Sequence, residues 1–214
     1  MRFNRVLDPA DRISEILFGL IMVLTYTSAL SVATAGHADV KTMLLGALGC
    51  NLAWGIIDAG LYLLSSLNER GRVVLMLRAV RTARDAAAAH REIAEVLPAP
   101  LAQALSVDQI ETVRQKLRQA PEPPKRPRLT GRDWLGALGI CLLVFLSTFP
   151  VVIPFVLIGD AKLALRISNL IVIVMLFLCG YAFARHTGVR PWPMGLLMIA
   201  VGLALAGVAI ALGG

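Results

Sequence analysis

Long apolar runs alternate with shorter polar segments along this chain, and the pattern predicts its elements. A helix needs about 20 apolar residues to cross the roughly 30 Å hydrocarbon core of a bilayer. The runs that meet this length are 15–34, 42–65, 134–157, 163–184 and 194–213. The pattern therefore predicts an all-α polytopic membrane protein with five transmembrane helices and a small helical insert between helices two and three.

The insert and its boundaries follow from helical periodicity and from proline. We expect domains at 1–65, 66–131 and 132–214, with insert helices at 72–97 and 107–119. The second span has no breaker at its inner end and can continue as helix past Gly71. Ser106 and Gln109 have the spacing of a capping box, which opens the second insert helix. A proline-rich stretch, 121–127, then predicts a stiff linker.

Composition supports the membrane assignment, and the basic residues orient the chain. Apolar residues make up 57% of the sequence, against about 45–50% in soluble domains, and the mean hydropathy is +0.72. Of the 21 Lys and Arg, only Lys41, Lys162 and Arg166 fall on one side of the predicted spans. Because positive residues concentrate in cytoplasmic loops, we expect a cytoplasmic N-terminus and insert and an external C-terminus. The compact form favours a bacterial inner membrane.

The net charge of +7 needs no nucleic-acid partner, since basic residues lie where topology and an anionic inner leaflet favour them. The sequence contains no Gly-rich phosphate loop, nucleophile elbow, HExxH or CxxC pair. We therefore predict neither an enzyme nor a resident cofactor.

Polar residues inside predicted spans are the candidate functional residues, because a charged group costs around 2.5–3.5 kcal/mol at the bilayer centre. Asp58 lies in span two, and Asn51 precedes it by two turns on the same face. Counting residues from the cytoplasmic ends places Met22 of span one level with Asp58. A carboxylate, an amide oxygen and a thioether suit Fe(II) or Mn(II). The competing interpretation is that Asp58 is protonated, or hydrogen-bonded to Asn51 or Tyr26 between helices, and that Met22 is an ordinary packing residue.

Other acidic residues form a weaker set of candidates. Glu15 lies near the inner membrane interface, where pairing with Arg12 is an alternative role. In the insert, Glu92 and Glu95 share one helix face, and so do Asp108 and Glu111. Each pair could present two carboxylates to a cation, although acidic residues among many arginines usually form a solvated, ion-paired surface.

In the third span, Pro150 and Pro154 each remove an amide donor, so a kink with exposed backbone carbonyls is expected. The segment Ser147–Phe155 looks like the paired-proline third helix of the vacuolar iron transporter family. Ala164–Ser168, Ala184–Pro191, Glu15–Leu20 and Gly55–Gly60 are similar to segments of its other helices. The sequence therefore resembles this family of Fe(II) and Mn(II) exporters over nearly its whole length.

The resemblance implies a homodimer that exchanges metal ions for protons, with insert glutamates gathering metal. Family members use an Asp on helix one and a Glu and a Met on helix two. Aligning Gly19 and Gly55 puts Met22 at the position of that Asp, Asn51 at that of the Glu, and Ala59 at that of the Met. Either the site is rebuilt around Asp58 with Met22 and Asn51, or the chain has lost iron transport and moves something else.

Two functional hypotheses follow. The first is a homodimeric, proton-coupled transporter of a divalent metal ion, with Asp58 as the shared site for metal and proton. The second is a membrane scaffold that transports nothing and whose cytoplasmic helices bind a protein partner or anionic lipid. The small number of carboxylates favours the second hypothesis, whereas Asp58 at depth and the two-proline helix favour the first.

Overall fold

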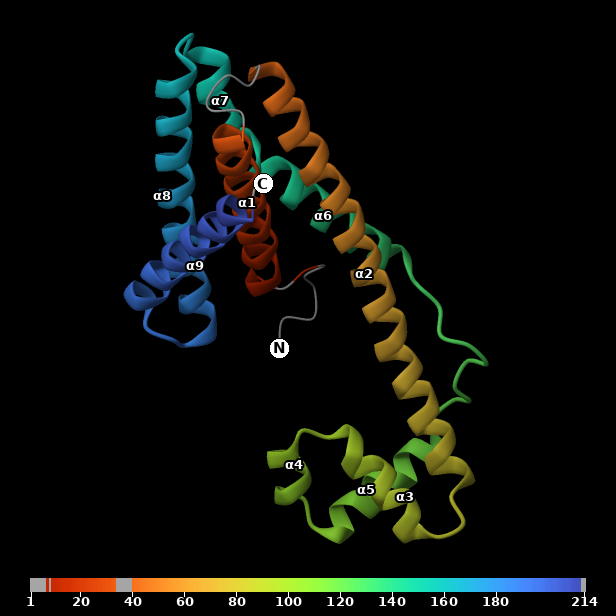
Figure 1. Cartoon of the computed structure of the whole chain (residues 1–214). Helices are drawn as coiled ribbons and strands as arrows, with labels where there is room; N and C mark the ends of the chain where they lie inside the picture. Colours follow the sequence, from red (N-terminus) through yellow and green to blue (C-terminus); the bar gives the residue numbers. More distant parts are fainter. Residues whose placement is uncertain (1–6, 8, 34–39, 213–214) are drawn as a thin grey trace. The chain divides into compact units, whose positions relative to one another are not determined.

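The computed structural model describes residues 7, 9–33 and 40–212, and within these ranges the secondary structure is entirely helical. The helices in chain order are α1 (Pro9–Ala33), α2 (Val40–Thr82), α3 (Ala86–Val96), α4 (Ala99–Ala104), α5 (Val107–Gln119), α6 (Gly131–Ser147), α7 (Phe149–Leu157), α8 (Ala161–Thr187) and α9 (Pro191–Ala211) (Figure 1). They form two compact units. Unit 1 comprises residues 1–62 and 131–214, and unit 2 comprises residues 63–130.

Four helical segments among the described residues are long and apolar enough to cross a membrane. They are Leu44–Thr82, Gly131–Leu157, Lys162–Thr187 and Pro191–Ala211, and they include most of the last four predicted spans. The predicted span 15–34 corresponds to α1 up to Ala33, and residues 34 and 213 lie outside the described residues. The count of five spans therefore stays a prediction.

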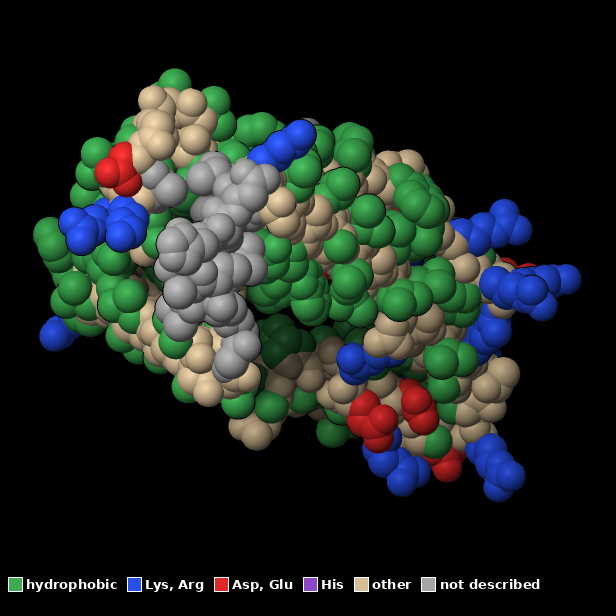
Figure 2. All heavy atoms as spheres, turned by 45° about the horizontal axis from the view of Figure 1, so that its top comes forward, with side chains coloured by type: hydrophobic (Ala, Val, Ile, Leu, Met, Phe, Trp, Pro, Cys, Tyr) green, Lys and Arg blue, Asp and Glu red, His purple; other side chains and the backbone are tan. Residues whose placement is uncertain are grey.

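Unit 1 has its core where α1 packs against α8 and α9 (Figure 1). Leu20, Val172 and Leu176 are completely buried there. α8 and α9 approach closely because Gly180 lies against the backbone of Gly195. Around this core many large apolar side chains stay exposed, and hydrophobic side chains cover much of the face seen in Figure 2. An apolar exterior of this extent is what lipid contact requires.

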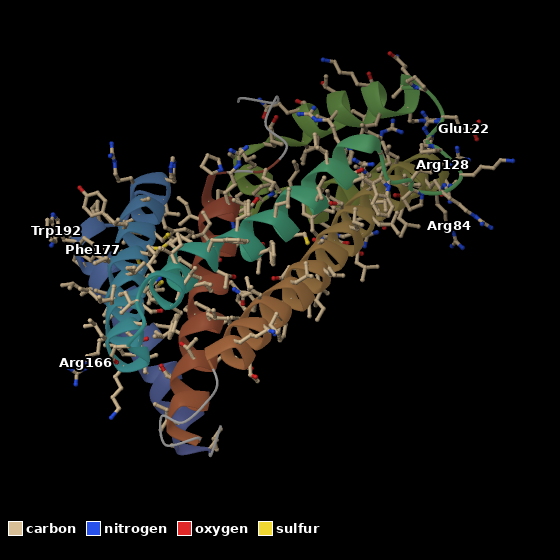
Figure 3. All side chains as sticks on the ribbon, turned by 90° about the horizontal axis from the view of Figure 1, so that it is seen from above. Arg84, Glu122, Arg128, Arg166, Phe177 and Trp192 are labelled. Carbon is tan, nitrogen blue, oxygen red and sulfur yellow. The ribbon has the colours of Figure 1, made fainter. Side chains whose placement is uncertain are left out.

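The contact between α8 and α9 is extended by aromatic residues. Phe177 and Trp192 point toward one another, with ring centroids 5.3 Å apart, and Tyr181 meets Trp192 edge-on at 6.1 Å (Figure 3). Aromatic pairs in such arrangements add stabilisation beyond their buried area.

The predicted third span is interrupted at Thr148, where α6 ends and α7 begins. Pro150 in the first turn of α7 and Pro154 inside it lack amide donors. Ser168 of α8 donates a 2.8 Å hydrogen bond to the carbonyl of Val151 and so fixes α7 to α8. The kink expected from the two prolines is thus present, as a break between two helices.

Unit 2 is a small helical bundle with its own core. Val80 of α2 packs with Ala89 and Ile93 of α3, and α5 closes this cluster with Ile110 and Val113. The predicted capping box is present, because the Ser106 side chain accepts from the Gln109 amide and the Gln109 side chain accepts from the Ser106 amide.

One predicted helix of unit 2 is wrong in its extent. The expected helix 72–97 is divided, since α2 ends at Thr82 and α3 begins at Ala86. The Asp85 carboxylate accepts a 2.6 Å hydrogen bond from the Ala88 amide and so starts α3 as an N-cap. Asp at this position satisfies an amide that would otherwise have no partner, and it favours a new helix start over continuation.

Arginines of α2 hold the proline-rich linker. Arg78 donates to the carbonyls of Pro124 at 2.9 Å and Lys125 at 2.6 Å, and Arg81 donates to carbonyls at the end of α5, including that of Ala120. Because proline-rich backbone forms no hydrogen bonds with itself, its carbonyls need such donors when they lie against protein.

Candidate metal site

Asn51 of α2 is the most deeply buried polar residue of unit 1 that sequence analysis singled out. Its side chain has no exposed surface. The amide nitrogen Nδ2 donates to the carbonyl of Gly19 on α1 at 3.1 Å and to the hydroxyl of Thr148 at 2.6 Å. One side chain thereby joins α1, α2 and the break between α6 and α7.

Gly19 makes this arrangement possible. A Cβ atom at position 19 would lie 2.2 Å from the Ser147 hydroxyl oxygen and 2.8 Å from the Val144 carbonyl. Only glycine lets α1 approach α6 so closely, and this approach brings the Gly19 carbonyl within reach of Asn51. The glycine in Glu15–Leu20, a segment for which the sequence analysis noted a family resemblance, is therefore explained by this close helix approach.

Two oxygen atoms of the predicted metal ligands are buried without a hydrogen-bond partner in the protein. They are Oδ1 of Asn51 and Oδ2 of Asp58. Buried polar atoms are nearly always paired, so an unpaired one needs an explanation such as water or an ion. Carboxylate and amide oxygens are the ligands that hard divalent cations take.

Asp58 of α2 and Glu15 of α1 are the acidic residues that lie near one another in the register of these two helices, which the contacts described below define. The rings of Phe18 and Trp54, one turn from these residues, meet edge-on with centroids 5.5 Å apart. Both side chains, Glu15 and Asp58, are partly buried. Two carboxylates near the same level favour a bound cation, because they repel one another when no cation lies between them.

The contacts between α1 and α2 fix an antiparallel register that differs from the predicted one. Gly19 lies opposite Asn51, and Tyr26 lies against Gly46, so Glu15 falls near the level of Asp58. Met22 lies three residues beyond Gly19, while Asp58 lies seven residues from Asn51 in the opposite direction. At about 1.5 Å per residue these offsets add to roughly 15 Å along the helices. Met22 and Asp58 are therefore not level, and Glu15 takes the place expected of Met22 near the level of Asp58.

The same register places Met22 near the level of Asn51. Its side chain is partly buried, and its carbonyl accepts a 2.9 Å hydrogen bond from the Thr25 hydroxyl. The predicted ligands thus fall into two levels of the α1 and α2 contact, with Glu15 and Asp58 at one and Met22 and Asn51 at the other. Sequence analysis missed Thr148, whose only signal was its place beside the two prolines.

Comparison with known families agrees with this architecture. A sequence model of the VIT family matches residues 13–214, nearly the whole chain. The chain belongs to the VIT family, the vacuolar iron transporter family. It is accordingly an integral membrane protein of a family of metal-ion transporters, which is not a family of enzymes. No individual curated protein matches the chain.

In this VIT-family chain the acidic residues of the insert differ in how exposed their side chains are. Glu92 is partly buried on α3, and Glu95 is exposed on the same helix. Asp108 is exposed in the first turn of α5. Within the described part of the chain, no three His, Cys, Asp or Glu side chains are grouped to hold a metal ion.

Glu111 of α5 is occupied by protein donors. Arg114 donates to both carboxylate oxygens at 2.8 and 2.7 Å, Gln115 donates to one at 3.0 Å, and the His90 ring nitrogen lies 2.8 Å from the other. Hydrogen bonds from Arg114 and then His90 hold the pKa of Glu111 well below its usual value. Glu111 could bind a cation only after releasing these partners, so the pair Asp108 and Glu111 does not present two open carboxylates here.

Proposed function

We propose that this VIT-family protein is a secondary transporter of Fe(II) or Mn(II), coupled to protons and working as a homodimer. The proposal includes a bacterial inner membrane, a cytoplasmic N-terminus and insert, and an external C-terminus. The observation that carries it is the pair of unpartnered buried oxygens on Asn51 and Asp58 in a chain of this family.

The ion would occupy two successive positions along α1 and α2. The first is formed by Glu15 and Asp58, and the second by Oδ1 of Asn51 with the thioether of Met22. Asn51 and Asp58 are seven residues apart, or about 10 Å along a helix. Because metal–oxygen bonds are about 2.0–2.6 Å long, these two residues serve an ion in turn and not together.

Coupling follows from competition at Asp58 and Glu15. A proton and a metal ion bind the same carboxylate oxygens, so loading the metal releases protons and protonation releases the metal. Two carboxylates near one level would strengthen the effect, because protonating one of them removes the repulsion that a bound dication would otherwise neutralise.

A second copy of the chain would complete the coordination. One copy offers few oxygen donors at each level, whereas Mn(II) and Fe(II) usually take more ligands than these. Exposed apolar side chains of α2, such as Leu52 and Ile56, are available for a helix contact between copies. In the insert, Glu92, Glu95 and Asp108 would serve as a weak collecting surface, which Glu111 could join once freed.

The test is proton-linked Mn(II) or Fe(II) flux in proteoliposomes containing Asp58→Asn. We expect at least a tenfold loss, with partial recovery in Asp58→Glu, because the asparagine cannot exchange a proton for a metal. Glu122→Gln is the matched control, since it removes one exposed carboxylate of unit 2 and should transport normally (Figure 3). Undiminished flux through Asp58→Asn would refute the mechanism.

The scaffold hypothesis is favoured by one observation, the engagement of Glu111 by Arg114 and His90, which leaves the insert with few open acids. Thermal unfolding with added Mn(II) separates the two hypotheses. A ligand at 100 times its dissociation constant stabilises the folded state by about 2.7 kcal/mol. A melting temperature that no divalent ion raises would support the scaffold.

A further inference from the structure

Unit 2 contains a pocket between α2 and the proline-rich linker, with a volume of about 530 Å³. Its apolar lining comes from Val73, Val74 and Leu77 of α2 and from Pro127 of the linker. Pockets of 300–1,000 Å³ with mainly apolar walls are typical of ligand sites.

The pocket is held open by hydrogen bonds that fasten the linker to α2. Arg70 donates to the carbonyl of Arg128 at 2.6 Å, and Arg78 donates to the carbonyls of Pro124 and Lys125. Because these bonds lie on both sides of Pro127, the wall that the linker supplies is fixed in place.

The residues that line this pocket lie close along the chain to two predicted membrane crossings. It is lined by residues at both ends of unit 2, namely Glu69 and Arg70 near its start and Arg126 and Arg128 near its end. The predicted span 42–65 ends about four residues, or 6 Å of helix, before Glu69. α6, the next segment able to cross a membrane, begins at Gly131. The pocket lining is therefore only a few residues along the chain from both predicted crossings, so we expect it near the membrane surface.

The rim of the pocket carries positive charge. Arg126 and Arg128 are exposed, and Figure 3 shows Arg128 on the linker. Arg70 adds a third charge, although its guanidinium already bonds the Arg128 carbonyl, and Glu69 is the one acidic residue of the lining. Arginine recognises phosphate oxygens with parallel hydrogen bonds. An apolar pocket with an arginine rim beside a bilayer fits an amphiphile with an anionic phosphate head.

We propose that the pocket of α2 and the proline-rich linker binds an anionic phospholipid. The phosphodiester lies between Arg126 and Arg128, and the first part of an acyl chain or the glycerol backbone lies on Val73, Val74, Leu77 and Pro127. Bound in this way, the lipid anchors unit 2 to the membrane. This site is independent of the metal pathway proposed above.

The experiment measures phosphatidylglycerol binding to the full-length protein in detergent by native mass spectrometry, with phosphatidylcholine as the zwitterionic comparison. Each basic residue near an anionic lipid surface contributes about 1 kcal/mol. Arg126→Gln with Arg128→Gln should therefore weaken phosphatidylglycerol binding on the order of 30-fold. The matched control, Arg84→Gln with Arg91→Gln, removes the same charge from exposed positions outside the pocket and should leave binding unchanged.

A further variant tests the apolar part of the pocket. Val73→Asn keeps the rim charges and should also reduce phosphatidylglycerol binding, because it puts a polar amide where the acyl chain or glycerol backbone of the lipid lies. The proposal is overturned if both arginine pairs reduce binding equally, which would show general charge attraction. It is also overturned if phosphatidylcholine binds as well as phosphatidylglycerol, or if soluble glycerol phosphate displaces the lipid, which would show a site for phosphate alone.

Discussion

The hydrogen bond between Asn51 and Thr148 gives a quantitative test of how the helices of unit 1 are held together. Asn51→Leu removes two interhelical hydrogen bonds at similar side-chain volume, and Thr148→Val removes one. Interhelical hydrogen bonds in membranes contribute about 0.6 kcal/mol on average and at most about 1.7. We therefore expect a cost of about 1–3 kcal/mol for the first change and about 0.6–1.7 for the second.

The double variant isolates the bond itself. Its cost should be smaller than the sum of the single costs by about 0.6–1.7 kcal/mol, because the bond between Asn51 and Thr148 can be lost only once. The 2.6 Å length of this bond and the complete burial of both residues favour the upper half of that range.

The assay is unfolding by sodium dodecyl sulfate in mixed micelles, followed by circular dichroism. Asn51→Leu combined with Thr187→Val serves as the control pair, since the Thr187 hydroxyl bonds only carbonyls of its own helix, α8. The control costs should add within about 0.3–0.5 kcal/mol. A coupling energy for Asn51 and Thr148 no larger than that of the control would refute the reasoning.

Two further predictions follow from close contacts and from charge. Gly19→Ala should destabilise unit 1 by about 1–3 kcal/mol, because its Cβ would lie 2.2 Å from the Ser147 hydroxyl oxygen, whereas Gly49→Ala meets open space and should be neutral or slightly stabilising. Melting temperatures of the two variants test this difference, and equal values would contradict it. The lowered pKa of Glu111, caused mainly by Arg114, means that its stabilising contribution is complete above about pH 4.5 and decreases as the pH falls below that. Glu111→Gln should therefore flatten the acid dependence of hydrogen exchange in unit 2, and an unchanged dependence would show that this carboxylate does not control it.

Local signals in the sequence predicted much of the fold. The capping box at Ser106 placed the start of α5, and the two prolines placed the break at Thr148 within a few residues. Both features depend on residues that are neighbours in the chain, so the sequence pattern contains the necessary information. The family was likewise predicted from short segments such as Ser147–Phe155, and the family match confirms it.

The candidate site was less predictable because it depends on how helices pair. Placing Met22 level with Asp58 assumed that both helices begin at the membrane edge, whereas the contact at Gly19 sets a different register. Thr148, the partner of Asn51, lies 97 residues away along the chain. Helical periodicity shows which residues share a face of one helix, but it does not show which residue of another helix they meet.

The fastening of the linker also bears on the order in which the protein is made. The carbonyls that Arg70, Arg78 and Arg81 hold all belong to residues between 117 and 128, and the core of unit 2 lies between residues 76 and 117. Every partner has therefore left the ribosome before the last three apolar segments are complete. Since domains fold from the N-terminus during synthesis, unit 2 can fold before these segments are made. The linker that precedes α6 is then already hydrogen-bonded to α2 when α6 enters the bilayer.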